Sequence, residues 1–284
     1  MATIIDGRLV SKQILEAAAA HAAELSERGI RPALAVVIVG DDPASRVYVD
    51  NKKKDCAKTG IASYEYTLPA DTQQGELLAI IRGLNSRKDI HGILVQLPLP
   101  AHLDEKEVLC AISPLKDVDA FHPVNVGHIM IGDFTLLPCT PAGVMELLSA
   151  YGVSPAGKHC VIIGRSNIVG KPMAMLMLKA DATVTVCHSK TRGLADITRQ
   201  ADILVAAVGK AGFVTADMVK PGAVVIDVGM NRNSEGKLCG DVDFEAVEKI
   251  AGMITPVPGG VGVMTRAMLM RNTLTAAENL EDNR

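Results

Sequence analysis

The chain has 284 residues, a length that corresponds to about two domains of ordinary size. Hydrophobic residues make up 48% and charged residues 21%, which excludes a disordered or collagen-like chain. The formal net charge is −3 and aromatic residues are only 3%. Proteins that hold nucleic acids need positive charge and stacking rings, so we expect no nucleic-acid partner.

Three further patterns limit the class of protein. The six cysteines include no Cys-x-x-Cys pair, which is typical of thiols in a reducing compartment. The histidines show neither His-x-x-x-His nor His-x-His spacing, so we expect no metal site. Asp6 and Arg8 stand where a signal peptide needs apolar residues, and no apolar run approaches the about 18 residues of a membrane helix. We therefore expect a cytoplasmic protein without a membrane partner.

The first half of the chain alternates helical segments with short β-branched runs, the pattern of a parallel α/β sheet. The predicted helices and strands are, in chain order, a helix over 7–28, a strand over 32–40, a helix over 41–58, a strand over 63–68, a helix over 73–85 and a strand over 91–100. The stretch 113–141 contains four prolines and little periodicity, which predicts loop and linker.

The second half begins with a predicted helix over 141–151. Four hydrophobic strands follow, KHCVIIG, ATVTVCHS, ADILVAAVG and GAVVIDVG, which indicate a doubly wound, Rossmann-like sheet. We expect an N-terminal α/β substrate domain over 1–138, a nucleotide-binding domain over 139–263, and an inter-domain cleft. The last helix, within 264–284, is expected to pack back on the N-terminal domain.

A glycine-containing segment, GRSNIVGKP from Gly164 to Pro172, joins the first of these strands to a helix. Gly164 allows a tight turn, Gly170 allows close helix–strand packing, and the helix N-terminus offers N–H groups to a pyrophosphate. The segment is neither G-x-G-x-x-G nor a P-loop. The alternative is a plain strand–turn–helix that binds nothing.

The end of the next strand indicates which dinucleotide binds. An NAD site places an acid there to hold the ribose 2′-hydroxyl, whereas this strand ends in VCHSK. Arg165 follows the first glycine and can pair with a 2′-phosphate, so we predict NADP. Lys190 and Arg192 lie nearby but are explained more simply as solvated loop charges, which leaves Arg165 and Ser189 as the stronger candidates.

Tyr48 and Lys52 are spaced i, i+4 and share one helix face. A phenol beside an ammonium makes an acid/base pair, because each group perturbs the proton affinity of the other. The alternative for Lys52 is a solvated face, since Lys53 and Lys54 follow it.

Two further polar positions support the catalytic hypothesis. Gln96 lies inside an apolar strand, where an unpartnered amide is costly, although a place at the strand's end would satisfy it. Asp117 and Asp119 lie in KDVDAFHPVN near the expected domain boundary. Turn and cap chemistry is an adequate explanation for one of the two.

Six motifs occur in the order VGDDPAS-x-VYV-x-x-K, HGILVQLPLP, KDVD-x-FHP-x-N-x-G, GRSNIVGKP, TVCHSKT and TPVPGGVG-x-MT. Over nearly the whole chain they resemble the bifunctional methylenetetrahydrofolate dehydrogenase/cyclohydrolase family. The resemblance implies NADP-dependent oxidation of 5,10-methylenetetrahydrofolate to 5,10-methenyltetrahydrofolate, then hydrolysis to 10-formyltetrahydrofolate in the same cleft. It also implies a homodimer and a place in one-carbon metabolism and purine biosynthesis.

Carried over by position, Lys52 is implied as the acid/base, Tyr48 as its positioning partner, Gln96 as the residue that tunes it, and Asp119 as the carboxylate that grips the pterin. The remaining implied substrate contacts are Val95, Leu97, Pro258, Gly259, Gly260, Val261 and Gly262. The implied NADP contacts are Gly164, Arg165, Ser166, Ser189 and Met230.

Three positions depart from the family pattern: Ala120 replaces the usual Gly after KDVD, Val263 replaces a Pro, and Met230 replaces Ile or Thr. Two rivals remain. Short-chain reductases also use Tyr-x-x-x-Lys, but their glycine loop precedes that pair, whereas here it follows. A non-catalytic relative would not need Lys52, Gln96 and Asp119 together.

Overall fold

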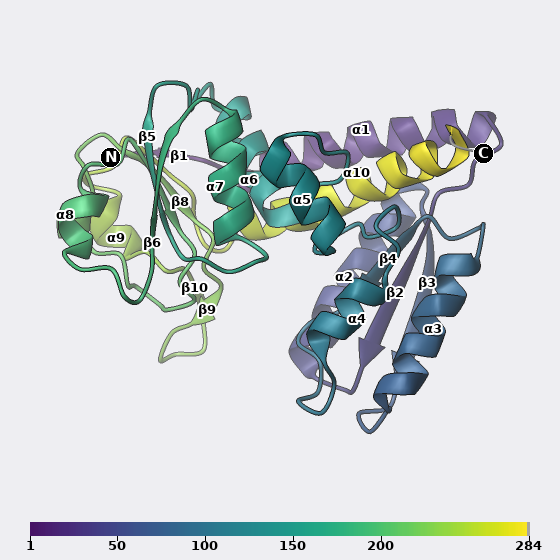
Figure 1. The fold of residues 1–284 in the computed structure, drawn as a ribbon. Coiled ribbons are helices and arrows are strands. Elements are labelled where there is room, and N and C mark those ends of the chain that lie inside the picture. The colour runs from purple at the N-terminus through teal and green to yellow at the C-terminus, as the bar shows by residue number, and fades with distance from the viewer. Residues whose placement is uncertain (283–284) are drawn as a thin grey trace. The chain divides into compact units, whose positions relative to one another are not determined.

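The computed structural model describes residues 1–282, which form two compact units (Figure 1). The first unit comprises Met1–Lys12 and Thr140–Thr265, and the second comprises Gln13–Cys139 and the chain from Arg266 onward. Both units are therefore discontinuous in sequence. Among the described helices, none combines the length and apolar character needed to cross a membrane.

The first unit contains a six-stranded sheet in the order β1-β11-β8-β7-β5-β6, with every neighbouring pair parallel. The order places β5 between β6 and β7, so the chain winds outward from β5 in both directions, as predicted for a doubly wound fold. The strands are β1 (Thr3–Ile4), β5 (His159–Ile163), β6 (Thr183–Cys187), β7 (Ile203–Ala206), β8 (Val224–Asp227) and β11 (Met253–Ile254). A separate antiparallel pair joins β9 (Asn231–Arg232) to β10 (Leu238–Cys239).

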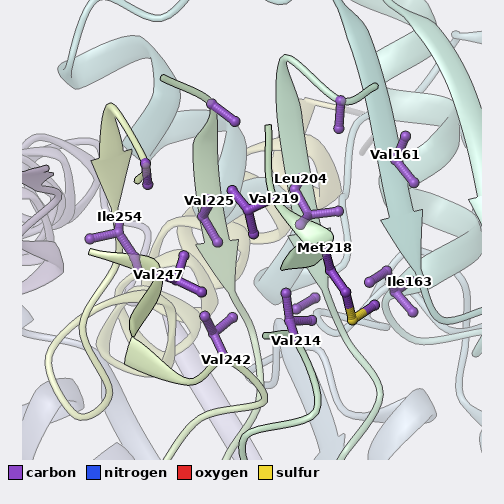
Figure 2. Close-up of a cluster of buried hydrophobic side chains, with 14 of the residues drawn as sticks. Val161, Ile163, Leu204, Val214, Met218, Val219, Val225, Val242, Val247 and Ile254 are labelled. Carbon is purple, nitrogen blue, oxygen red and sulfur yellow. The ribbon is translucent and has the colours of Figure 1, made fainter. Parts of the chain in front are cut away.

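Apolar side chains from the sheet and its connections form the core of this unit (Figure 2). Strands of a parallel sheet are covered on both faces, which explains why they appear in the sequence as continuous apolar runs. Val161, Leu204 and Val225 come from adjacent strands and are fully buried, and Val214 and Val247 pack on them from the connecting segments. The helices of this unit are α6 (Cys139–Ala150), α7 (Gly170–Lys179), α8 (Leu194–Thr198), the 3₁₀ turn Ala216–Met218 and α9 (Phe244–Val247).

Residues 1–12 differ from the expectation that they form part of the N-terminal domain. Thr3–Ile4 pairs with Met253–Ile254 at the edge of the six-stranded sheet. The Ala2 N–H donates to the Glu248 carbonyl and the Ile5 N–H donates to the Ile254 carbonyl. A strand of two residues is too short to show period-2 alternation, so the sequence pattern did not predict it.

The second unit contains a three-stranded parallel sheet in the order β3-β2-β4. Its central strand β2 is buried along its whole length. Alternate residues of the sheet pack against Leu77, Ile81 and Val108 of two covering helices. The strands are β2 (Ala33–Val39), β3 (Ala62–Leu68) and β4 (Gly92–Val95). The helices are α1 (Gly7–Glu27), α2 (Pro43–Thr59), α3 (Gln74–Ser86), α4 (Glu105–Ala111), α5 (Pro123–Ile131) and α10 (Val261–Asp282). The first residues of α1 and of α10 belong to the first unit.

Local capping explains the ends of α2. The Asp42 carboxylate accepts the Ser45 N–H at 2.8 Å, Pro43 opens the helix, and Gly60 ends it at φ +73°. These ends confirm the predicted helix to within two residues.

Two predicted segments differ from the structure. The strand expected over 91–100 ends at Val95, because Pro98 and Pro100 have no N–H to extend the ladder. The segment 113–141, expected to be loop, contains α5, which begins at Pro123 and ends at Gly132 with φ +76°. Proline is favourable at the first helical position, so Pro123 starts a helix here and does not break one.

Candidate active site

Lys52 is held by a side-chain amide. Its Nζ donates a hydrogen bond of 2.9 Å to Gln96 Oε1, and Gln96 Nε2 donates one of 2.6 Å to the Leu97 carbonyl. Gln96 immediately follows β4, and its backbone N–H donates to the Val37 carbonyl. Because the Gln96 amide nitrogen is used by Leu97, its carbonyl oxygen is turned to Lys52 as an acceptor, which suits either protonation state of the amine.

The surroundings of Lys52 change the pKa of its amine. Burial lowers the pKa of Lys52 below its ordinary value, the nearby Asp119 carboxylate partly opposes this, and the Arg266 guanidinium adds to the decrease. Burial also raises the pKa of Asp119, and the Lys52 charge opposes that change. The amine and the carboxylate are therefore close enough to affect each other. Tyr48 lies one turn before Lys52 in α2 and is 37% exposed.

Asp117 and Asp119 have different surroundings in the segment between α4 and α5. The backbone of Asp117 forms an isolated β-bridge with Ile93. Its carboxylate accepts hydrogen bonds from the His122 N–H at 2.7 Å and from Asn125 Nδ2 at 3.0 Å. Burial raises the pKa of Asp117 to about 6. Asp117 is thus the turn-forming residue of the two, and Asp119 is the one whose carboxylate lies near Lys52.

The Ala120 backbone has φ +55°, in the left-handed region that favours glycine. Its N–H donates to the Asp117 carbonyl at 3.0 Å, which closes the turn. A Cβ in this conformation costs roughly 1–2 kcal/mol, so the departure from the family's usual glycine places strain directly after Asp119.

Two buried side chains, neither of which was singled out in the sequence, clamp the Asp119 loop. Lys116 Nζ donates to the carbonyls of Leu84, Asn85 and Arg87 at the end of α3. Asn272 of α10 donates from Nδ2 to the carbonyls of Val118 (2.8 Å) and Leu137 (2.7 Å). A cation such as Lys116 is favourable at a helix C-terminus, and a buried polar side chain such as Asn272 needs hydrogen-bond partners. These two general rules are the only sequence features that could have indicated Lys116 and Asn272.

Other ionisable groups surround the Lys52 amine. The buried Asp55 carboxylate lies 3.0 Å from Arg266 Nη1, and its pKa is raised by burial. The buried Cys139 thiol forms a hydrogen bond with Asp119, and burial raises the thiol pKa well above its usual value. Cys56 lies 3.7 Å from Met270, so α2 contacts α10 directly at this position.

The glycine segment of the first unit is tightly packed. Gly164 has φ +130°, and a Cβ there would overlap the Ala207 carbonyl. A Cβ on Gly170 would overlap the Gly164 carbonyl. Ser166 Oγ accepts the N–H groups of Val169 (3.1 Å) and Gly170 (3.4 Å) at the start of α7. The loop therefore requires both glycines, and Ser166 caps the helix.

The residues present fit NADP. Arg165 and Ser189 are both exposed, and they lie just beyond the carboxyl ends of β5 and β6, which pair in register at Ile163 and Cys187. The winding direction of the sheet reverses at β5, which lies between β7 and β6. Ligands of doubly wound sheets bind at the carboxyl ends of the strands next to such a reversal. A cation and a hydroxyl without a carboxylate at the end of β6 suit a 2′-phosphate.

The PGGVG loop, 258–262, precedes and opens α10. Gly259 has φ +110° and its carbonyl accepts the Gly7 N–H at 2.9 Å. A Cβ on Gly262 would lie 2.8 Å from the Met230 methyl, so the structure brings Met230 and this loop together. No group of three or more His, Cys, Asp or Glu among residues 1–282 could hold a metal ion.

Comparisons with known proteins agree with this arrangement. The family model "Tetrahydrofolate dehydrogenase/cyclohydrolase, catalytic domain" matches residues 5–119, and "Tetrahydrofolate dehydrogenase/cyclohydrolase, NAD(P)-binding domain" matches residues 138–281. The "Bifunctional protein FolD" of Acidovorax sp. (strain JS42) is 60% identical over 280 residues, which cover 98% of this chain and 99% of that protein.

Two solved structures show the same similarity. The bifunctional methylenetetrahydrofolate dehydrogenase/cyclohydrolase of Campylobacter jejuni has a TM-score of 0.97 and 51% identity, covering 98% of this chain and 99% of its own. The dehydrogenase-cyclohydrolase of Trypanosoma brucei, solved with NADP cofactor and inhibitor, has a TM-score of 0.93 and 43% identity, with 98% of each chain covered.

The Asn272 clamp leads to a stability prediction. Asn272→Ala removes the hydrogen bonds to the Val118 and Leu137 carbonyls, so the free energy of unfolding should fall by about 1–3 kcal/mol. Urea unfolding measures it. Thr273→Ser is the matched control, because it keeps the hydroxyl that bonds the Leu269 carbonyl within the same helix. A midpoint for Asn272→Ala no lower than that of the control would contradict the clamp.

Proposed function

Since this chain belongs to the tetrahydrofolate dehydrogenase/cyclohydrolase family, we propose which of its residues carry each of that family's two reactions. The protein is a bifunctional NADP-dependent enzyme: it oxidises 5,10-methylenetetrahydrofolate to 5,10-methenyltetrahydrofolate and hydrolyses that product to 10-formyltetrahydrofolate. The observation that carries the proposal is the Lys52–Gln96 hydrogen bond beside Asp119.

The oxidation needs orientation and no protein base. Bound NADP would supply the acceptor for the hydride that leaves the folate methylene carbon, and loss of that hydride would leave the folate as a methenyl cation. We propose that Asp119 holds the pterin, because a carboxylate accepts paired N–H bonds in one plane. Asn272, through the Val118 carbonyl, keeps Asp119 in place while this happens.

The hydrolysis needs a proton acceptor, and Lys52 meets the requirement. Water attacks the methenyl carbon and must lose a proton, and an amine with a lowered pKa can take it. Gln96 Oε1 holds Nζ in one position before and after the transfer. Tyr48, one turn away, is proposed to orient the substrate.

The NADP and folate contacts on the first unit follow from the same placement. Arg165 and Ser189 are proposed to bind the 2′-phosphate, and the Gly164–Gly170 turn with Ser166 to border the pyrophosphate. Met230 is proposed to supply a backbone contact to the cofactor. Pro258 to Gly262 are proposed to contact the folate. In the second unit, Val95 and Leu97 are also proposed as folate contacts.

We also propose a homodimer in the cytoplasm. Strand β6 is the last strand of its sheet and pairs only with β5, and its Val186 is 38% exposed. An edge strand with β-branched, exposed residues is a surface on which a second copy can pair about a two-fold axis. All six cysteines are free thiols, which supports a reducing compartment.

The Lys52 assignment predicts a separation of the two activities. Lys52→Met should abolish hydrolysis of methenyltetrahydrofolate while NADPH formation from methylenetetrahydrofolate persists, since only the first needs a base. Lys52→Arg should lose hydrolysis too, because guanidinium keeps its proton. In the parent enzyme the hydrolysis rate should rise with pH through the lowered pKa of Lys52.

Both activities are followed by absorbance, of methenyltetrahydrofolate and of NADPH. Lys53→Met is the matched control, because Lys53 is the exposed neighbour in the same helix and should keep both activities. Hydrolysis by Lys52→Met at the parent rate would exclude the acid/base role.

The Arg165 assignment predicts cofactor preference. Arg165→Ala should raise the KM for NADP roughly 10- to 100-fold, the range of a lost hydrogen bond to a charged group, and leave the KM for NAD unchanged. Lys190→Ala is the control, as an exposed cation beyond β6 that we assign to the solvated surface. Equal losses for NADP and NAD would show that Arg165 does not read the 2′-phosphate.

The β6 proposal predicts the oligomeric state. Light scattering on the eluting protein should give the mass of two chains, and Val186→Asp should give the mass of one. Leu178→Asp places the same charge at an exposed apolar position of α7, outside strand β6, and should leave the dimer intact. A parent protein that elutes as a monomer would refute the proposal.

A further inference from the structure

Two buried aspartates of the first unit take no part in the chemistry above. Asp227 ends β8 and is 3% exposed, and Asp241 lies just beyond β10 and is 0% exposed. We propose that Asp241 is a positioning residue for NADP: its carboxylate fixes the loops that follow β7 and β8 in the conformation that binds the cofactor. The inference rests on the proposed binding of NADP to this unit.

The Asp241 carboxylate is saturated with hydrogen bonds from both loops. Oδ2 accepts the N–H groups of Val208 (2.5 Å) and Gly209 (3.0 Å), and Oδ1 accepts the Lys210 N–H (2.8 Å). Oδ1 also accepts Asn231 Nδ2 at 2.9 Å. Two carboxylate oxygens offer about four acceptor positions, and four donors occupy them. One side chain therefore ties the loop after β7 to Asn231, the first residue of β9, where the loop after β8 ends.

Asp227 in turn fixes the backbone of Asp241. Its Oδ1 accepts the N–H groups of Gly229 and Asp241, and its Oδ2 accepts the Val242 N–H, each at 2.9 Å. Burial raises the pKa of Asp227 to about 6, and the adjacent Asp241 charge contributes to the increase. A Cβ on Gly229 would overlap the Asp241 carboxyl, and a Cβ on Gly240 would overlap that of Asp227. The two carboxyls are packed into backbone with no room for another side chain.

The position of these loops relates them to the cofactor. They follow β7 and β8 at the carboxyl edge of the parallel sheet, the edge from which Gly164 and Arg165 extend after β5. The Ala207 carbonyl lies against Gly164, and Met230 belongs to the loop after β8. The Asp241 anchor therefore sets the backbone that borders the proposed dinucleotide site.

The same geometry explains why a carboxylate is needed. The three successive N–H groups of Val208, Gly209 and Lys210 all donate to the Asp241 carboxylate. Successive backbone N–H groups in this arrangement bind anions. Asp241 supplies that anion from within the chain, so the loop keeps its shape before NADP arrives. Preorganisation of this kind increases affinity because less ordering remains to be done on binding.

Asp241→Asn in the full-length enzyme tests the proposal. The carboxamide nitrogen cannot accept N–H groups, so part of the loop is released. The dissociation constant of NADP, measured by calorimetry, should rise roughly 10- to 100-fold. Hydrolysis of methenyltetrahydrofolate needs no NADP and should keep its rate and its KM. Asp243→Asn is the matched control: Asp243 is exposed, caps α9, and should leave NADP binding unchanged.

The outcomes separate this inference from the proposed function. If the parent enzyme binds NADP and Asp241→Asn binds it equally well, the inference fails alone. If hydrolysis falls together with NADP binding, Asp241 has only a structural role. A parent enzyme that fails to bind NADP would overturn both. If Asp241→Asn does not fold, Asn231→Ala is the second variant, because it removes a single donor to Asp241. The affinity for NADP should then fall severalfold while the hydrolysis rate is unchanged. An unchanged affinity for NADP would refute the proposal.

Discussion

The hydrogen bond between the Lys52 amine and Gln96 is the interaction on which the proposed site of the second unit depends. Burial lowers the pKa of Lys52, and the nearby Asp119 carboxylate opposes that decrease. Asp119 and Arg266 act on it in opposite directions, and Gln96 fixes its position without adding charge. Helix α2, the end of β4, the Asp119 loop and α10 must all keep their places for that balance to persist.

Side chains, more than regular secondary structure, hold the functional loops of both units. Lys116 and Asn272 anchor the Asp119 loop through backbone carbonyls. Asp241 holds the loop after β7 through backbone N–H groups and the start of β9 through the Asn231 side-chain amide. All three anchoring side chains are buried. Loops without a repeating ladder need such partners, because unpaired buried backbone groups are costly.

The sequence predicted the long helices and strands because their signals are local. Asp42 and Gly60 border helix α2 directly, and the i, i+4 spacing of Tyr48 and Lys52 is visible within it. The catalytic roles of these two residues stay predictions. The anchors were missed because their partners are distant in sequence: Asn272 bonds Val118, and Asp241 bonds Val208. Strand β1 and helix α5 were missed because two residues carry no periodicity and Pro123 was interpreted as a breaker.

The pairing of β1 with β11 affects the order in which the chain can fold during synthesis. Thr3–Ile4 leaves the ribosome well before its partner Met253–Ile254, because the rest of both units lies between them in sequence. Strand β1 must therefore remain unpaired until β11 is translated, although domains made early generally fold early. The two-residue length of β1 limits the exposed edge during that wait, so the strand that closes the sheet presents little surface for wrong pairing.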